Sequence, residues 1–287
     1  MKKIKTYILI NYNRIINFLM KPNIRNIDET IDTLIKNRYS VARFGDGELG
    51  IINERSINFQ ESNILLANRL KEIIKSKDNQ IMICIPRALI DTSIYNKEAK
   101  YFWDEHLKIG RMAWYKVIDL KKIYFDTKFT RLYMDYKDKD KSKEWFERIK
   151  KVWSNKDIVI VEGDKSRLGV GNDLFDECKS IKRVLAPSKN AFYQYSNILD
   201  YILKNVDNDK MILIALGPTA TVLAYDLSRY GYQAIDIGHI DIEYEWFLKK
   251  SNKKVAIRNK FVNEVDNGSI LEEFYNQEYI QQIIKTI

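Results

Sequence analysis

The chain has 287 residues, of which 45% are hydrophobic and 30% charged, a balance typical of soluble globular proteins and not of disordered or fibrous ones. It has four prolines and two cysteines far apart in sequence, which excludes a proline-rich linker, a disulfide framework and a paired-cysteine zinc site; a reducing compartment fits best. The formal net charge of +9 favours anionic ligands, but no basic stripe with interleaved aromatic residues accompanies it, so we expect no nucleic-acid partner.

Residues 1–25 form a basic, amphipathic N-terminal segment. On a helix, one face would carry the apolar side chains Ile4, Ile8, Tyr12, Ile15 and Leu19. The apolar run is too short to span a bilayer, and no small-residue cleavage site follows it. Two interpretations remain open: a helix lying on an anionic membrane surface, or an ordinary helix packed on the domain. We expect a cytoplasmic protein, peripheral on the inner face of the membrane if the first interpretation holds.

From residue 26 to 287, short β-branched runs alternate with amphipathic stretches in what we interpret as one domain. The predicted strands are 40–44, 80–86, 131–134, 157–162, 183–186, 211–216 and 234–237. The predicted helices are 28–37, 62–76, 91–107, 143–153, 190–204, 219–230, 240–249 and 269–284. Nearly all strands are apolar throughout, which is typical of strands buried on both faces. The pattern predicts a Rossmann-like α/β fold, with a mainly parallel sheet and helices on both faces.

Ligands in such sheets bind beyond the carboxyl ends of the strands. The segment after the first predicted strand is Arg43-Phe44-Gly45-Asp46-Gly47-Glu48. Its two carboxylates offer the oxygen ligands that Mg²⁺ and Mn²⁺ prefer, usually together with substrate phosphates. Gly45 lets the backbone approach a ligand closely, and Arg43 can pair with a phosphate. Taken alone, the segment is equally a glycine turn with solvated carboxylates.

A second polar segment, 162–173, follows the predicted strand 157–162. Its glycines lie among Lys165, Ser166, Arg167 and Asn172 at a strand-to-helix crossover. Free amides at a helix N-terminus and nearby cations suit a diphosphate. The segment lacks the Gly-Lys-Ser/Thr ending of a Walker loop. The alternative is a long polar loop in which Asn172 or Asp173 caps the next helix.

The third segment, Gly217-Pro218-Thr219-Ala220-Thr221, follows the predicted strand 211–216. Its small residues leave the next helix N-terminus open to an anion, although simple capping by Thr219 explains it as well.

The fourth segment follows the predicted strand 234–237 and carries His239, Asp241 and Glu243. The two acids can ligate a metal or act as a base, and His239 can orient either acid or contact a phosphate. The alternative is that the acids favourably charge the N-terminus of a helix. Each segment alone is a weak signal. Four segments that follow strands of one parallel sheet meet at one edge, where they suit a metal-bridged diphosphate ligand.

Read in order, these segments resemble the bacterial GT-D fold glycosyltransferases, first catalogued as a domain of unknown function. The resemblance runs from about Ser40 to Phe247 and rests on residues 40–48, 130–135, 162–173, 187–192, 217–221 and 236–246. It implies a UDP-sugar donor and Mn²⁺ or Mg²⁺ held by an Asp-x-Glu motif. We expect the acceptor to be a glycan on a polyprenyl lipid or a surface protein, the basic N-terminal segment favouring the lipid.

Two pairs match that motif. We favour Asp46 and Glu48 as metal ligands because their glycines permit close approach, and Asp241 or Glu243 as the acceptor-side base. The expected nucleotide-sugar ligands are Arg43, Phe44, Gly45, Lys165, Ser166, Arg167, Asn172, Gly217, Pro218, Thr219, Ala220 and Thr221. Two alternatives are a nucleotide-sugar-binding protein without turnover and a metal-dependent phosphoesterase, although the latter normally uses more histidine or aspartate ligands.

Overall fold

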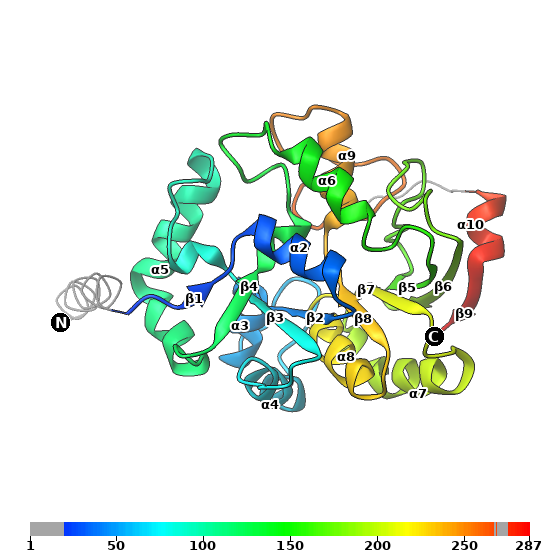
Figure 1. Cartoon of the computed structure of the whole chain (residues 1–287), viewed down its shortest axis with the longest axis horizontal. Coiled ribbons are helices and arrows are strands. Elements are labelled where there is room, and N and C mark those ends of the chain that lie inside the picture. The colour runs from blue at the N-terminus through cyan, green and yellow to red at the C-terminus, as the bar shows by residue number, and fades with distance from the viewer. Residues whose placement is uncertain (1–19, 267, 269–274) are drawn as a thin grey trace.

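The computed structural model describes residues 20–266, 268 and 275–287. Within these residues, nine strands form one sheet in the order β1-β4-β3-β2-β8-β7-β5-β6-β9 (Figure 1). All neighbouring strands pair in parallel. The strands are β1 (Asn23–Ile24), β2 (Ser40–Arg43), β3 (Ile81–Ile85), β4 (Ile123–Asp126), β5 (Asp157–Gly163), β6 (Ser180–Ala186), β7 (Met211–Ala215), β8 (Gln233–Asp236) and β9 (Ile283–Thr286). The expected parallel α/β fold is confirmed.

Helices cover both faces of this sheet. In Figure 1, α2 (Ile27–Lys36), α6 (Ser142–Lys150) and α9 (Ile240–Leu248) lie above it. Below it lie α3 (Asp46–Ile52), α4 (Ile64–Ile73), α7 (Tyr195–Asn205) and α8 (Pro218–Arg229). The long helix α5 (Lys97–Val117) lies beside the β1 edge, and α10 (Gln277–Gln282) beside β9. Short 3-10 turns are η1 (Arg87–Leu89), η2 (Thr127–Thr130) and η3 (Ala191–Gln194). The central strands are apolar because both of their faces are covered: all five residues of β3 are buried.

The two central strands, β2 and β8, set the position of a crevice. They are neighbours in the sheet, with Val41 paired to Ile235. After β2 the chain turns to α3 on the lower face, whereas after β8 it turns to α9 on the upper face (Figure 1). Connections that leave neighbouring strands toward opposite faces open a crevice between the strand ends. The expected ligand site therefore lies at the ends of β2 and β8.

One predicted strand is wrong, and two predicted helices have bounds that differ from those observed. The predicted strand 131–134 is an unpaired loop, although Leu132, Tyr133 and Met134 are buried, and the strand beside β3 is instead β4, which starts eight residues earlier, at Ile123. Burial of Leu132 and Met134 comes from packing in a loop, which an apolar run cannot distinguish from a strand. The helix predicted at 91–107 begins only at Lys97, where the Asn96 side chain accepts a hydrogen bond from the Ala99 amide.

The C-terminal helix predicted at 269–284 is also wrong at its end, because α10 stops at Gln282 and β9 follows. Residues 269–274 of that helix lie outside the described residues, as do residues 1–19 of the basic segment. The domain boundary at residue 25 stays a prediction. No helix in the described part of the chain is long and apolar enough to cross a membrane.

Candidate functional site

A pocket of about 790 Å³ opens at the carboxyl ends of the strands. All four predicted segments contribute to its lining: Gly45, Asp46, Gly47 and Glu48 after β2, Gly163 at the end of β5 with Ser166 after it, Leu216 and Gly217 after β7, and Gly238, His239 and Asp241 after β8. The predicted convergence of the four segments on one site is therefore what the structure shows. The volume is within the range of about 300–1,000 Å³ that ligand pockets occupy.

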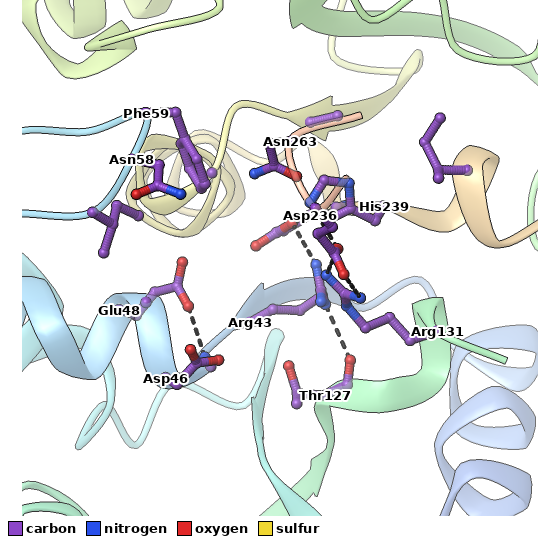
Figure 2. A pocket seen from close by; sticks show the side chains of 18 of the residues that line it. Arg43, Asp46, Glu48, Asn58, Phe59, Thr127, Arg131, Asp236, His239 and Asn263 are labelled. Carbon is purple, nitrogen blue, oxygen red and sulfur yellow. Dashed lines mark hydrogen bonds and ion pairs between the residues drawn. The ribbon is translucent and has the colours of Figure 1, made fainter. Parts of the chain in front are cut away.

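Arg43 lies at the centre of this pocket (Figure 2). Its Nη1 is 3.2 Å from Oδ1 of Asp236, and its Nε donates to the Thr127 carbonyl at 3.2 Å. Arg43 ends β2 and Asp236 ends β8, so the pairing of these strands brings the two charges together. Gly238 makes room for the guanidinium: a Cβ at this position would lie 1.9 Å from Nη1. Sequence reasoning had not marked Asp236 as a site residue, although it directly precedes the fourth segment.

Asp46 and Glu48 belong to a helix and not to a free turn. Gly45 is the N-cap of α3, and Oε2 of Glu48 accepts a hydrogen bond from the Gly45 amide at 2.7 Å. Both carboxylates line the pocket, Asp46 exposed and Glu48 half-buried (Figure 2). Burial, and next the Asp236 carboxylate, raise the pKa of Glu48 to about 7. A cation beside Glu48 would relieve this repulsion.

The chemistry of this donor set fits a hard divalent metal. Nowhere in the described ranges do three or more histidine, cysteine, aspartate or glutamate side chains form a metal-binding group. A metal at Asp46 and Glu48 would therefore take its other ligands from substrate phosphates and water. That division is usual for Mg²⁺, which binds through one or two carboxylates plus phosphates.

The segment after β5 contributes less than expected. Ser166 lines the pocket, whereas Lys165, Arg167 and Asn172 do not. Arg167 Nη1 donates to the Asn259 carbonyl at 2.8 Å, and the Lys165 carbonyl accepts from the Phe261 amide at 3.0 Å. The side-chain amide of Asn172 donates hydrogen bonds to the carboxylates of Asp241 and Glu245 in α9. Lys165 and Arg167 therefore fasten segment 254–264 to the sheet edge and Asn172 contacts α9, so the prediction that these three residues line the ligand site is corrected.

Only part of the segment after β7 lines the pocket. Gly217 lines the pocket with a φ of +54°, and a Cβ there would lie 2.4 Å from the Phe59 ring. Phe59 thus packs directly on Gly217. The other predicted ligands of this segment form the buried first turn of α8 and do not line the pocket: Pro218, Thr219, Ala220 and Thr221.

Two of these residues have internal partners instead. The Ala220 amide donates to the Gly217 carbonyl at 2.9 Å, and the Thr221 hydroxyl donates to the Arg43 carbonyl at 2.8 Å. Phe44 is likewise a core residue, fully buried, with its amide donating to the Cys84 carbonyl at 2.8 Å. Phe44 and the first turn of α8 therefore support the site from behind, and the prediction that they contact the ligand is corrected.

The second Asp-x-Glu pair is structural, because α9 is buried. Asp241 lines the pocket, but it is only 2% exposed and accepts hydrogen bonds from Lys260 Nζ at 2.8 and 2.9 Å. Glu243 lies outside the pocket lining and accepts hydrogen bonds from the backbone amides of Tyr133 and Met134 at 3.1 and 2.8 Å. Asp241 is paired with Lys260, and Glu243 is buried outside the pocket lining, which argues against the acceptor-side base predicted for this pair.

His239 lines the pocket as expected. Burial, and next the charge of Arg131, lower the pKa of His239 to about 4, so the ring is neutral near pH 7. Its Nε2 is 3.6 Å from Glu264, which also pairs with Arg131 and Lys254, each at 2.5 Å. Burial would raise the pKa of Glu264, but Arg131 and the other cations hold it well below its ordinary value.

Sequence reasoning missed this charge cluster. Lys254 and Glu264 follow α9 in the sequence, in a stretch that contains no recognisable motif. The sequence predicted Arg131 to begin a strand, and nothing in that prediction indicated that its side chain would face the pocket. Figure 2 shows Arg43 between the Asp46 and Glu48 pair on one side and His239 with Arg131 on the other.

Comparisons with known proteins agree with this geometry. Residues 41–265 match the family model described as glycosyltransferase GT-D fold. The chain is 40% identical over 266 residues to a probable glycosyl transferase, Gly, of Streptococcus gordonii, and 37% identical over 265 residues to the glycosyltransferase GlyD of Streptococcus pneumoniae. These stretches make up 92% of this chain but only 39% and 32% of the two relatives, so the chain spans roughly a third to two fifths of their length.

Solved structures are similar over almost the whole chain. One is described as the domain of unknown function 1792 with a distinct glycosyltransferase fold: the TM-score is 0.88 at 40% identity, covering 98% of this chain and 99% of that one. Another is a glycosyltransferase from Streptococcus sanguinis, with a TM-score of 0.88 at 38% identity, covering 93% of this chain and all of the other.

Proposed function

Because the chain belongs to the glycosyltransferase GT-D fold family, we propose that it moves a hexose from a UDP-sugar to a glycan acceptor with the help of Mn²⁺ or Mg²⁺. The observation that carries this proposal is the arrangement of charge around the β2–β8 crevice. Asp46 and Glu48 supply oxygen ligands on one side of Arg43, and His239 and Arg131 lie on the other. A metal-bound diphosphate would match both sets, with the metal at the carboxylates and the phosphates beside Arg43.

The nucleotide end of the donor belongs on the β5 and β7 side of the pocket. Gly163 and Gly217 have no side chain that would fill the pocket there, and the half-buried ring of Phe59 packs on Gly217. Such a face suits a uracil ring, which stacks readily on aromatic side chains.

Arg43 acts on the diphosphate. It is held in one orientation by Asp236 and by the Thr127 carbonyl, so it contributes positive charge to the leaving group without reorganising. His239 is neutral and can donate or accept a hydrogen bond at a phosphate or sugar oxygen. A metal bound by Asp46 and Glu48 would supply Lewis-acid stabilisation of the departing UDP.

The acceptor in this proposal is a glycan of the cell surface, carried on a polyprenyl lipid or a protein. The lipid form, together with a cytoplasmic location and peripheral membrane contact, rests on the basic residues of segment 1–25, such as Lys2, Lys3 and Lys5. Removing residues 1–21 and measuring binding to anionic vesicles tests it: undiminished binding would remove the membrane role.

The function itself is tested by UDP release from a panel of UDP-sugars with Mn²⁺, using the wild type and the double variant Asp46→Asn with Glu48→Gln. Loss of a metal ligand set should lower the rate by roughly a hundredfold or more. Binding of a UDP-sugar without any turnover by the wild type would favour a non-catalytic binding protein. Near wild-type turnover by the double variant would refute the metal assignment.

A further inference from the structure

We propose that the α5 side of the pocket is a subsite for the acceptor sugar, in which Phe102 provides the surface on which a neutral sugar ring lies. This inference rests on the proposed function and adds to it the location and chemical class of the acceptor site. It is carried by the contacts of α5 and of the segment that follows β4.

The pocket has two ends. β3 and β4 lie on one side of β2 in the sheet, whereas β8, β7 and β5 lie on the other. The glycine-bearing donor segments follow β5 and β7. On the opposite side, the pocket is lined by Asn96, Glu98, Phe102 and Trp103 of α5 and its cap, and by Lys128 and Asp135 after β4. Arg43 lies between these ends, so a group bound on the α5 side would face the diphosphate from across the crevice.

The α5 wall is fixed to the segment opposite it. The Asn96 amide donates to the Asp135 carbonyl at 2.8 Å, and its side chain donates to the Met134 carbonyl at 2.7 Å. The first turn of α5 is therefore tied to the lining residue Asp135. A subsite between these two segments is preorganised, which reduces the entropic cost of binding.

An aromatic surface faces this end of the pocket. Phe102 lines the pocket yet is 46% exposed. Its ring packs on His106, with centroids 5.9 Å apart and an interplanar angle of 23°, and its edge contacts Trp103. Both neighbours hold the ring in place. An exposed, immobilised aromatic ring inside a polar pocket suits a ligand with an apolar face and a polar rim, as a sugar ring has.

The opposite wall offers hydrogen bonds without net positive charge. Lys128 and Asp135 are buried, form an ion pair and line the pocket. Thr127, 5% exposed, also lines it, and its hydroxyl has no hydrogen-bond partner in the described structure. Glu98 adds a carboxylate. Donors and acceptors together match sugar hydroxyls, whereas the acidic balance disfavours a second phosphate.

The test is saturation-transfer NMR with methyl β-glucoside, methyl β-galactoside and methyl β-N-acetylglucosaminide as probes. We expect at least one probe to bind the wild type, and to bind Phe102→Ala about tenfold more weakly. Phe102→Tyr should restore binding. Tyr101→Ala is the matched control: Tyr101 is the neighbouring residue on α5, is 69% exposed and does not line the pocket, so binding should be unchanged.

Adding saturating UDP distinguishes glycoside binding on the α5 side of the pocket from binding on the nucleotide side. Under the proposal, UDP leaves the glycoside signal in place. No binding by any probe, full binding by Phe102→Ala, or displacement by UDP would each overturn the subsite. UDP-sugar turnover is measured in parallel on the same proteins. Glycoside binding without any turnover supports the subsite and overturns the proposed enzymatic function alone.

Discussion

Glu48 combines a local structural task with a place in the pocket. It accepts the Gly45 amide at the start of α3, and it faces Asp236 across the crevice. Burial and this second carboxylate raise its pKa to about 7. The folded state therefore holds a proton on Glu48 at pH values where the unfolded chain, with an ordinary pKa of 4.5, has released it.

The raised pKa of Glu48 makes the free energy of unfolding depend on pH. The stabilisation from this raised pKa is fully present below pH 4.5 and is lost as the pH rises through about 7. Glu48→Gln keeps a hydrogen-bond acceptor for Gly45 but cannot titrate. Without divalent metal, we expect the free energy of unfolding of the wild type to fall relative to Glu48→Gln between about pH 5 and pH 8, measured by urea denaturation. A constant difference over this range would contradict the assignment.

Gly217 and Gly171 make a matched pair of glycines. Both have positive φ, +54° and +82°, but a Cβ at Gly217 would collide with Phe59, whereas nothing lies within 4 Å of one at Gly171. Gly171→Ala should cost only the backbone strain of about 1–2 kcal/mol and leave UDP binding intact. Gly217→Ala should cost more and also weaken UDP binding, because Phe59 must move. Calorimetry of UDP binding by both variants checks this, and equal affinities would contradict the role of Phe59.

At the scale of elements, segment 254–264 completes the pocket without belonging to a helix or strand. Its anchor is Lys260, 3% exposed, whose Nζ lies 2.8 Å from Asp241 and 2.9 Å from Glu245 of α9. Because these acids are four residues apart on one helix, they face the same way and share one lysine. The segment thereby brings Lys254 and Glu264 to Arg131 and His239.

Removing this anchor should be costly. Lys260→Met would leave the buried Asp241 carboxylate without its cation and Glu245 with only the exposed Lys249, with an expected loss of about 3–5 kcal/mol in the free energy of unfolding. Lys249→Met is the control, because Lys249 also pairs with Glu245, at 3.7 Å, but is 53% exposed. Its loss should be below about 1 kcal/mol. Urea denaturation of both variants measures the difference, and a similar small loss for both would show that the buried cluster is not the anchor.

Elements with strong hydrophobic patterns could be predicted from the sequence. The strands at β3, β5 and β7 read as apolar runs because both of their faces are covered. α3 was missed because its seven residues contain two glycines, and its stability comes from capping by Glu48 and packing of Leu49 and Ile51. β9 was missed because its strand character depends on pairing with β6, a contact distant in sequence.

At the scale of the whole molecule, contacts between residues distant in sequence also decide which predicted residues belong to the site. The order of strands and loops predicted which segments meet, and Arg43, Asp46, Glu48, Gly217 and His239 all line the pocket. The sequence could not show which charges pair internally. Asp46 and Asp241 lie in the same Asp-x-Glu pattern, but Lys260, nineteen residues along the chain, neutralises Asp241. Partner choice among charges depends on tertiary contacts that no local pattern encodes.

The central claim is that the β2–β8 crevice binds a metal-bound UDP through Asp46 and Glu48. Titration calorimetry with UDP, with Mn²⁺ and with EDTA in its place, tests it most directly. We predict that Mn²⁺ tightens UDP binding by the wild type at least tenfold, about 1.4 kcal/mol, and that Asp46→Asn with Glu48→Gln abolishes this gain while keeping metal-free binding. Equal affinity with and without Mn²⁺ in the wild type, or an undiminished gain in the double variant, would contradict the account.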